Sequence, residues 1–192
     1  MRWVNLTHTS NKDSFYQTFS LSDEDVIRLL IEYRYKYDEN YYLSNQTSAL
    51  SITGASPLNQ ELIVLFADLD ELVKTSPLSP LQLQMMQLIQ EGYTYDEIEA
   101  MLPVNRSSIT NGMRRIYKII KQQNDYQWRR CIYTNTLKLK TKRCSHCKED
   151  LPATDEFFTV DEGKIDMFHG RCKRCRNAIK KEKSRESVTK RK

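Results

Sequence analysis

Four of the five cysteines in this 192-residue chain form two Cys-x-x-Cys pairs, which are separated by residues 148–171. Two close thiol pairs brought together by a loop can present four sulfurs about 2.3 Å from one tetrahedral zinc ion. Neither pair lies in a βαβ pattern, which a thioredoxin-like redox site requires. The spacing therefore predicts one structural zinc ion, and two redox pairs or thiols without a metal are the alternatives. The predicted ligands are Cys144, Cys147, Cys172 and Cys175.

Other side chains near these pairs are weaker candidates as ligands. His146 and His169 lie close in sequence, but four cysteines already complete a tetrahedral shell, so we expect both histidines to be bystanders. The fifth thiol, Cys131, has no partner at ligand spacing and is expected to be buried or incidental. Lysine and arginine residues flank both pairs, and their charge would offset the net negative charge of a zinc ion with four thiolates.

Upstream of the cysteines, residues 78–125 have the pattern of three short helices joined by tight turns. Apolar residues recur at helical spacing in each of them. Gly112 weakens the third helix by about 1 kcal/mol relative to alanine, and it permits close approach to another surface. The residues expected to cap, begin or end the helices are Ser79, Pro80, Gly92, Thr94, Glu97, Pro103 and Asn105.

The third predicted helix carries polar side chains that could contact DNA. In a helix-turn-helix, the N-terminal turns of the last helix enter a major groove about 12 Å wide, and the preceding helix crosses the backbone. Asparagine pairs with adenine and arginine with guanine, whereas serine and threonine bind phosphates or base edges. We expect Glu97 and Glu99 to face away from the phosphates. The predicted DNA-binding residues are Arg106, Ser107, Ser108, Thr110, Asn111, Arg114 and Arg115. A purely structural three-helix bundle is the alternative.

Residues 78–120 resemble the DNA-binding helix-turn-helix of sigma-factor region 4 and of LuxR-type response regulators. The matching motifs are Leu78-Ser79-Pro80, Gly92-Tyr93-Thr94, Glu97-Ile98, Ser108-Ile109 and Arg115-Ile116-Tyr117-Lys118. Pro103 stands where these families usually have a glycine in the turn. The resemblance covers about a quarter of the chain and implies a reader of DNA sequence; the rest of a sigma factor is not recognisable.

The cysteine region resembles small zinc modules of the treble-clef or zinc-ribbon kind, which occur in phage and bacterial DNA-binding proteins and near some HNH nucleases. Phe157, Phe158 and Phe168 would supply its apolar core, and residues 176–183 would continue as a basic helix. That continuation favours a treble clef. Because so small a core needs its metal to fold, we expect metal binding and folding to be one event.

Charge is distributed unevenly along the chain, whose formal net charge is +5. Residues 1–77 contain 6 Lys/Arg against 11 Asp/Glu, whereas residues 131–192 contain 17 against 9.

In the N-terminal region, helices are expected at about 22–37 and from Pro57 onward. We interpret the cluster Tyr33, Tyr35, Tyr37, Tyr41 and Tyr42 as packing or a protein interface rather than as stacking on bases. Asp68, Asp70 and Glu71 are interpreted as a solvated face.

Several functional classes are disfavoured by what the sequence lacks. No apolar run is long enough to span a membrane, and the first residues do not form a secretory signal. An HNH nuclease needs several histidines, whereas the chain has 3 in all. Asp161, Glu162 and Asp166 are interpreted as loop charges. Since four thiolates leave zinc no open position for a catalytic water, we expect a protein that is not an enzyme.

These patterns predict a mainly α-helical fold with a small C-terminal zinc module. The predicted domains are an acidic helical region 1–77, a helix-turn-helix domain 78–125, a linker 126–140, the zinc module 141–180 and a basic tail 181–192. We expect a sequence-specific DNA-binding transcription regulator of phage or bacterial type, cytoplasmic and associated with the nucleoid. The zinc module and residues 180–192 would hold phosphates of double-stranded DNA.

The N-terminal region is expected to bind a protein partner, either RNA polymerase or a second copy of the chain, and no membrane. Two other functional interpretations stay open. One is a zinc-dependent protein- or RNA-interaction protein without base readout, in which the three helices only pack. The other is a nuclease accessory factor.

Overall fold

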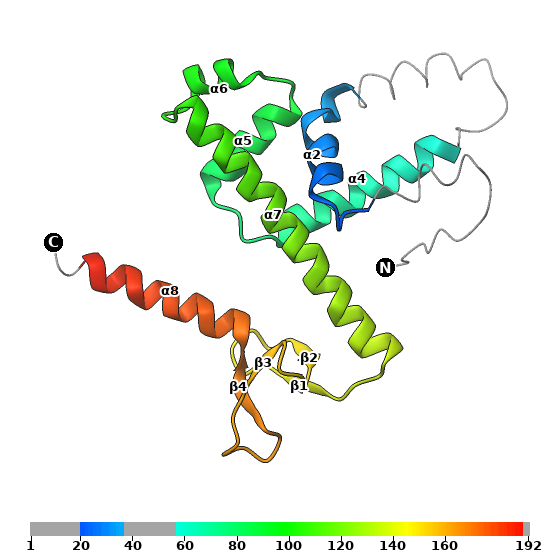
Figure 1. Ribbon diagram of the computed structural model, residues 1–192, viewed down its shortest axis with the longest axis vertical. Helices are drawn as coiled ribbons and strands as arrows, with labels where there is room; N and C mark the ends of the chain where they lie inside the picture. The colour runs from blue at the N-terminus through cyan, green and yellow to red at the C-terminus, as the bar shows by residue number, and fades with distance from the viewer. Residues whose placement is uncertain (1–19, 37–56, 190–192) are drawn as a thin grey trace. The chain divides into compact units, whose positions relative to one another are not determined.

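The computed structural model describes residues 20–36 and 57–189 of the chain (Figure 1). The chain divides into two compact units, with the border between Asp125 and Tyr126. The described part is mainly helical, as the sequence predicts, and contains two small antiparallel sheets of two strands each. Among these residues, no helix is both long enough and apolar enough to cross a membrane.

The first unit is built from helices. They are α2 (Glu24–Glu32), α4 (Pro57–Thr75), α5 (Pro80–Gln90), α6 (Tyr95–Met101) and α7 (Arg106–Cys131). Helix α2 contacts α5, and α5 contacts α6. The last residues of α7, 126–131, belong to the second unit. Of the tyrosine cluster, Tyr33 and Tyr35 are described, whereas Tyr37, Tyr41 and Tyr42 lie outside the described residues.

The predicted caps of the three short helices are confirmed. Ser79 and Thr94 each form a capping box with the residue three positions later, and each hydroxyl accepts from the backbone N–H there. The side-chain oxygen of Asn105 accepts from the N–H of Ser108 over 2.8 Å. Gly92 follows α5 with a φ of +94°, a left-handed conformation that glycine adopts without strain. These local interactions fix where α5, α6 and α7 begin and where α5 ends.

The start of α2 differs from the sequence-based expectation. The helix expected from about residue 22 begins at Glu24, and Asp23 is its cap, with its carboxylate accepting from the N–H of Asp25 over 2.8 Å. The hydroxyl of Ser22 instead accepts from the side-chain amide of Asn124 on α7 over 3.0 Å. A hydrogen bond to a residue 102 positions away in sequence thus holds the segment that precedes α2.

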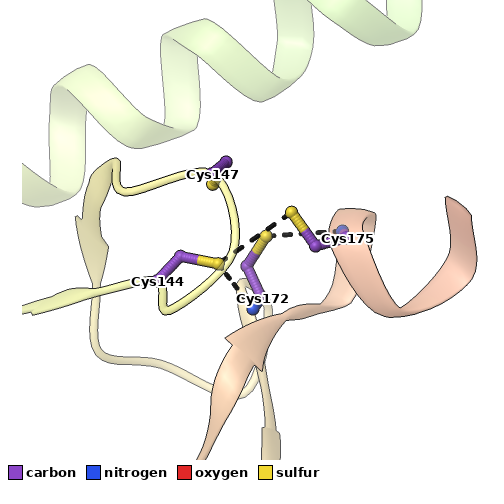
Figure 2. A group of neighbouring side chains, drawn as sticks. All are labelled: Cys144, Cys147, Cys172 and Cys175. Atoms are coloured by element: carbon purple, nitrogen blue, oxygen red, sulfur yellow. Dashed lines mark hydrogen bonds between the residues drawn. The ribbon is translucent and has the colours of Figure 1, made fainter. Parts of the chain in front are cut away.

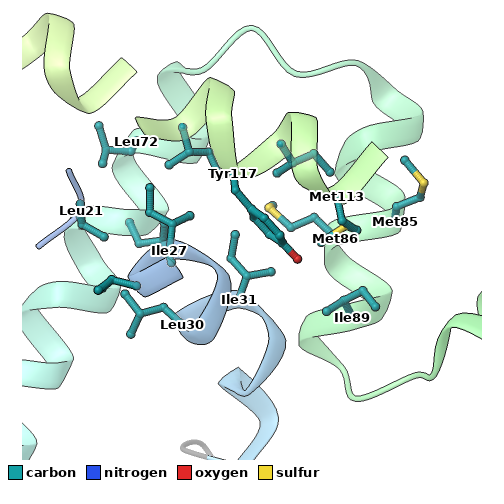
Figure 3. Packing of buried hydrophobic residues seen from close by; sticks show 14 of the residues in the cluster. Leu21, Ile27, Leu30, Ile31, Leu72, Met85, Met86, Ile89, Met113 and Tyr117 are labelled. Carbon is teal, nitrogen blue, oxygen red and sulfur yellow. The ribbon is translucent and has the colours of Figure 1, made fainter. Parts of the chain in front are cut away.

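One apolar core joins the five helices of this unit (Figure 3). Ile27 and Ile31 of α2 are fully buried and lie with Leu72 of α4, Met86 of α5 and Met113 of α7. The core also contains the inward stripe predicted for the third short helix, Ile109, Met113, Ile116 and Ile120. Burial of each such side chain contributes about 1.5–3 kcal/mol, so this unit has a substantial core of its own.

Gly112 permits a close approach, as the sequence suggested, and the neighbour is inside the same unit. A Cβ atom at this position would lie 2.8 Å from the terminal methyl group of Met85 on α5. The small residue thus lets α5 pack closely against α7.

The second unit contains a short π-helix, four short strands and one long helix among its described residues. In chain order they are η1 (Ile132–Thr136), β1 (Thr141–Arg143), β2 (Asp150–Pro152), β3 (Phe158–Val160), β4 (Phe168–Cys172) and α8 (Lys173–Thr189). β1 pairs with β2 and β3 pairs with β4, both antiparallel, and an irregularity interrupts the second pairing. The segment expected to be a linker, 126–140, contains the end of α7 and the whole of η1.

Candidate metal centre and exposed face of helix α7

The four paired cysteines come from two structural features of the second unit (Figure 2). Cys144 and Cys147 lie in the turn that joins β1 to β2, where the N–H of Lys148 donates to the carbonyl of Cys144 over 3.0 Å. Cys172 is the last residue of β4, and Cys175 lies in the first turn of α8. A tight turn and a strand-to-helix junction therefore bring both pairs together.

The four sulfur atoms lie within 4.8 Å of one another. The Sγ atoms of Cys144 and Cys175 are 3.9 Å apart, close to the edge of about 3.8 Å that a tetrahedron with metal–sulfur bonds of 2.3 Å requires. Cys144, Cys172 and Cys175 are buried, whereas Cys147 is exposed. The residues predicted as ligands are thus close enough to hold one metal ion, and their chemistry is compatible with a structural zinc.

The electrostatics of the cluster favour a cation. Burial raises the pKa of the Cys144 thiol, but the N–H of Cys172 donates to its sulfur over 3.3 Å, and the N–H groups of Cys147 and His146 add to this, bringing the pKa to about 6. Burial raises the pKa of Cys172 and of Cys175, and the neighbouring thiols raise that of Cys175 further. One thiol therefore ionises readily while its neighbours resist, and a bound divalent cation would remove that resistance.

The remaining histidines and the fifth cysteine have other surroundings. The Nδ1 atom of His169 accepts from the N–H of Arg171 over 3.1 Å, and neither His169 nor His146 belongs to the metal-compatible cluster of the described residues. The sulfur of Cys131 accepts from the side-chain amide of Asn135 over 3.3 Å, and this thiol is half-buried.

A small apolar core lies beneath the cysteines. Phe157 and Phe158 are buried and Phe168 is partly buried, as predicted, and Leu151 of β2 is fully buried with them. Two further aromatic residues, Tyr126 and Tyr133, lie in the segment that we expected to be a linker.

Tyr126 is held on both sides. Its ring centroid lies 5.0 Å from that of Phe157, and the guanidinium carbon of Arg174 lies 3.2 Å from the ring centroid of Tyr126. Burial raises the pKa of Tyr126 to about 12. Sequence reasoning missed this contact; the aromatic residues at 126, 128 and 133 were the only available signal.

The predicted DNA-binding residues share the outer side of α7. Six of the seven are exposed and Thr110 is half-buried, whereas the apolar stripe of the same helix is buried. Arg106 forms an ion pair with Asp96 of α6, and both side chains are well exposed. Glu97 is engaged in the capping box of α6, where the N–H of Thr94 donates to its carboxylate over 2.7 Å. The structure thus brings the predicted residues together on one accessible helix face.

A polar cleft of about 530 Å³ lies beside this face. Arg114 and Arg115 of α7 line it together with Glu24, Asp25 and Glu32 of α2. The carboxylate of Glu32 accepts from two phenols of the unit, over 2.9 Å from Tyr117 and 3.4 Å from Tyr95. These carboxylates are a feature that sequence analysis did not anticipate, because α2 and α7 are far apart in the chain.

Comparison with models of known protein families finds no match. Comparisons with characterised proteins and with solved structures find none either. The resemblance of residues 78–120 to sigma-factor and LuxR-type helix-turn-helix domains therefore stays a prediction, as does that of the cysteine region to known zinc modules.

Proposed function

We propose that this chain is a sequence-specific DNA-binding transcription regulator whose α7 helix reads bases and whose four cysteines hold one structural zinc ion. The observation that carries the proposal is the outer face of α7. Its first ten residues place arginine, serine and asparagine side chains in solvent, while Ile109, Met113 and Ile116 anchor the opposite face in the core. A rigid helix with exposed hydrogen-bonding groups at its N-terminal end is suited to the major groove.

The elements before α7 support this proposal. Helices α5 and α6 are short, both begin with capping boxes, and only residues 102–105 separate α6 from α7. In a helix-turn-helix the corresponding short helix crosses the DNA backbone and the longer one enters the groove. Asn111 would then suit adenine, and Arg114 or Arg115 would suit guanine.

For the second unit we propose a zinc module of the treble-clef kind. Its support is the order of elements: a cysteine-bearing turn between β1 and β2, the β3–β4 hairpin, and a helix whose start carries the second cysteine pair. Four thiolates would saturate the ion and leave no position for a water molecule, so we assign the site a structural role and no catalytic step. RNA polymerase or a second copy of the chain stays our prediction for the N-terminal region.

The direct test is selection of binding sites from a random duplex pool by the zinc-loaded full chain at about 0.15 M salt. We expect one motif to be enriched. In the Arg114→Ala/Arg115→Ala variant, the ratio of affinities for that motif and for a scrambled duplex should fall by about tenfold or more, because a good bidentate contact contributes about 1–3 kcal/mol of discrimination.

The matched control is Lys36→Ala/Lys74→Ala, which removes the same charge from the first unit but leaves α7 intact. It should keep the sequence preference of the parent. Enrichment of no motif, or an equal loss of preference in both variants, would show that α7 does not read bases and would favour a zinc-dependent interaction protein.

A further inference from the structure

The second unit has an open groove of about 410 Å³ between β4 and α8, which lies outside both the cysteine cluster and the α7 face. Arg171 lines it from β4, and Arg176, Lys180 and Lys183 line it from α8. All four side chains are exposed, and none makes an ion pair within the described part of the chain. Four cations thus converge on one concave surface, and no described carboxylate forms an ion pair with them.

Several other cations of this unit are engaged within the protein. Lys142 pairs with Asp166 and donates to the carbonyl of Phe168, and Lys148 donates to the carbonyl of Ser145. Arg129 and Arg130 pair with glutamates, and Arg174 stacks on Tyr126. Others, Lys140, Lys164 and Lys181 among them, are exposed and make no ion pair among the described residues, but they do not line the groove. The convergence of four unpaired cations on one concave surface is therefore what makes the groove a surface for an external anion.

The sequence of α8 places its charges in a way that fits this role. Positions 176, 180 and 183 follow helical spacing, so they share one face over about 10 Å of helix. Among the described residues, no carboxylate lines the groove, since Glu182 and Glu186 of the same helix are not among its lining residues. A DNA duplex carries one phosphate charge per about 1.7 Å of axis, so 10 Å of duplex offers more phosphates than these three side chains can bind.

We infer that this groove binds the phosphate backbone of duplex DNA without reading its sequence. Contacts from lysine and arginine to phosphates add affinity but carry no direct information about the base sequence. Single-stranded nucleic acid is instead bound on successive aromatic side chains. Within the part of the chain that the structure describes, the only ring in the lining is His169, whose Nδ1 accepts from the N–H of Arg171, and the only aliphatic side chain is Ile179.

This inference rests on the proposed function, because its ligand is the duplex that α7 would read. The test measures the affinity of the zinc-loaded full chain for a mixed-sequence duplex at several salt concentrations between about 0.05 and about 0.3 M. Each phosphate contact contributes about 0.9 to the slope of log Kd against log salt. The triple variant Arg176→Gln/Lys180→Gln/Lys183→Gln should therefore lower that slope by about 2 to 3.

The matched control is Lys140→Gln/Lys164→Gln/Lys181→Gln, which removes three exposed cations of the same unit that do not line the groove. Its slope should stay close to that of the parent. Equal changes in the two triple variants would overturn the inference, because only the overall charge would then matter. If the Arg176 change disturbs metal loading, the double variant Lys180→Gln/Lys183→Gln should still lower the slope by about 2.

Two further outcomes separate this inference from the proposed function. Tighter binding of an A-form RNA duplex than of DNA, lost in the groove variant, would reassign the groove to RNA and overturn the inference. If α7 reads bases, the ratio of selected to scrambled affinities should survive the groove substitutions. A preserved sequence preference with an unchanged salt slope would refute the groove alone, whereas a lowered slope without any enriched motif would refute base reading alone.

Discussion

Removal of zinc should unfold the second unit while the first unit stays folded. The core beneath the cysteines has three fully or nearly fully buried apolar side chains outside the cysteines, Leu151, Phe157 and Phe158. At about 1.5–3 kcal/mol each, they contribute roughly 5–9 kcal/mol. A structural zinc site contributes about 10–16 kcal/mol in small metal-binding domains. Because the metal would contribute more free energy of folding than the apolar core, the second unit should unfold when the metal is lost.

The expected signal can be worked out from α8. This helix has 17 residues, and most of its described side chains are exposed. Most helical stability in proteins comes from tertiary packing rather than from intrinsic propensity, so loss of the fold on chelation should remove helical ellipticity equivalent to up to 17 residues. Before chelation we expect only Cys131, which lies outside the cysteine cluster, to react with a thiol reagent. After chelation the four clustered thiols should react as well.

The assay is circular dichroism together with thiol titration, before and after a chelator and again after zinc is restored. Cys172→Ser should reproduce the chelated state, and Cys131→Ser should leave both readouts unchanged apart from one thiol. Intact α8 ellipticity with four unreactive thiols in the metal-free chain would refute the reasoning, because the apolar core alone would then suffice.

Three other perturbations have defined outcomes. Hydrogen bonds from the backbone N–H and the hydroxyl of Thr94 lower the pKa of Glu97 below its ordinary value of 4.5. The ionised carboxylate therefore stabilises the fold above that pH, and this stabilisation is lost as the pH falls through the lowered pKa. Glu97→Gln should make the urea midpoint of unfolding depend less on pH between about pH 7 and 3, and an unchanged pH dependence would contradict this. Asp96→Asn frees the exposed Arg106, and should change the free energy of unfolding by less than about 1 kcal/mol while tightening DNA binding; weaker binding would show that the ion pair positions the arginine. Glu24→Gln/Asp25→Asn removes negative charge from the cleft beside α7 and should raise DNA affinity a few-fold at low salt and less at high salt; a loss of affinity would place DNA elsewhere.

The sequence was most informative where structure depends on neighbours in the chain. Capping at Ser79, Thr94 and Asn105 needs partners only three residues away, so the starts of the three helices could be predicted, whereas α7 continues to Cys131, beyond the predicted boundary at residue 125. The cysteine pairs could be predicted for a related reason, since each pair is local and only the closure between them is long-range. Helical spacing likewise identified the buried stripe of α7.

What sequence analysis missed depends on distant contacts. The segment before α2 is held by a hydrogen bond from Asn124 to the hydroxyl of Ser22, and no local pattern records that interaction. Tyr126 becomes part of the core of the second unit only because Phe157 and Arg174 pack on its two sides. Residues 126–140 were interpreted as a linker. Their order comes from contacts with residues that follow them in the chain.

The two units differ in what stabilises them, and this difference separates sequence preference from general affinity for DNA. The face of α7 that would read bases is anchored by Ile109, Ile116 and Ile120, in a core without a metal site among its described residues. Arg115 lies three helical turns before the border at residue 126. Chelation of zinc should therefore preserve the ratio of affinities for the selected and the scrambled duplex.

The groove on α8, by contrast, lies in the unit that we propose is held together by zinc. Without zinc, its cations are no longer held on one concave surface, and the slope of log Kd against log salt should fall by about 2 to 3, as in the groove variant. The measurement is the same salt titration with chelated protein, performed on both duplexes. If sequence preference disappears together with the salt dependence, then α7 needs the second unit in order to enter the major groove of DNA. Base reading by α7 and phosphate binding by the α8 groove would then not be separable.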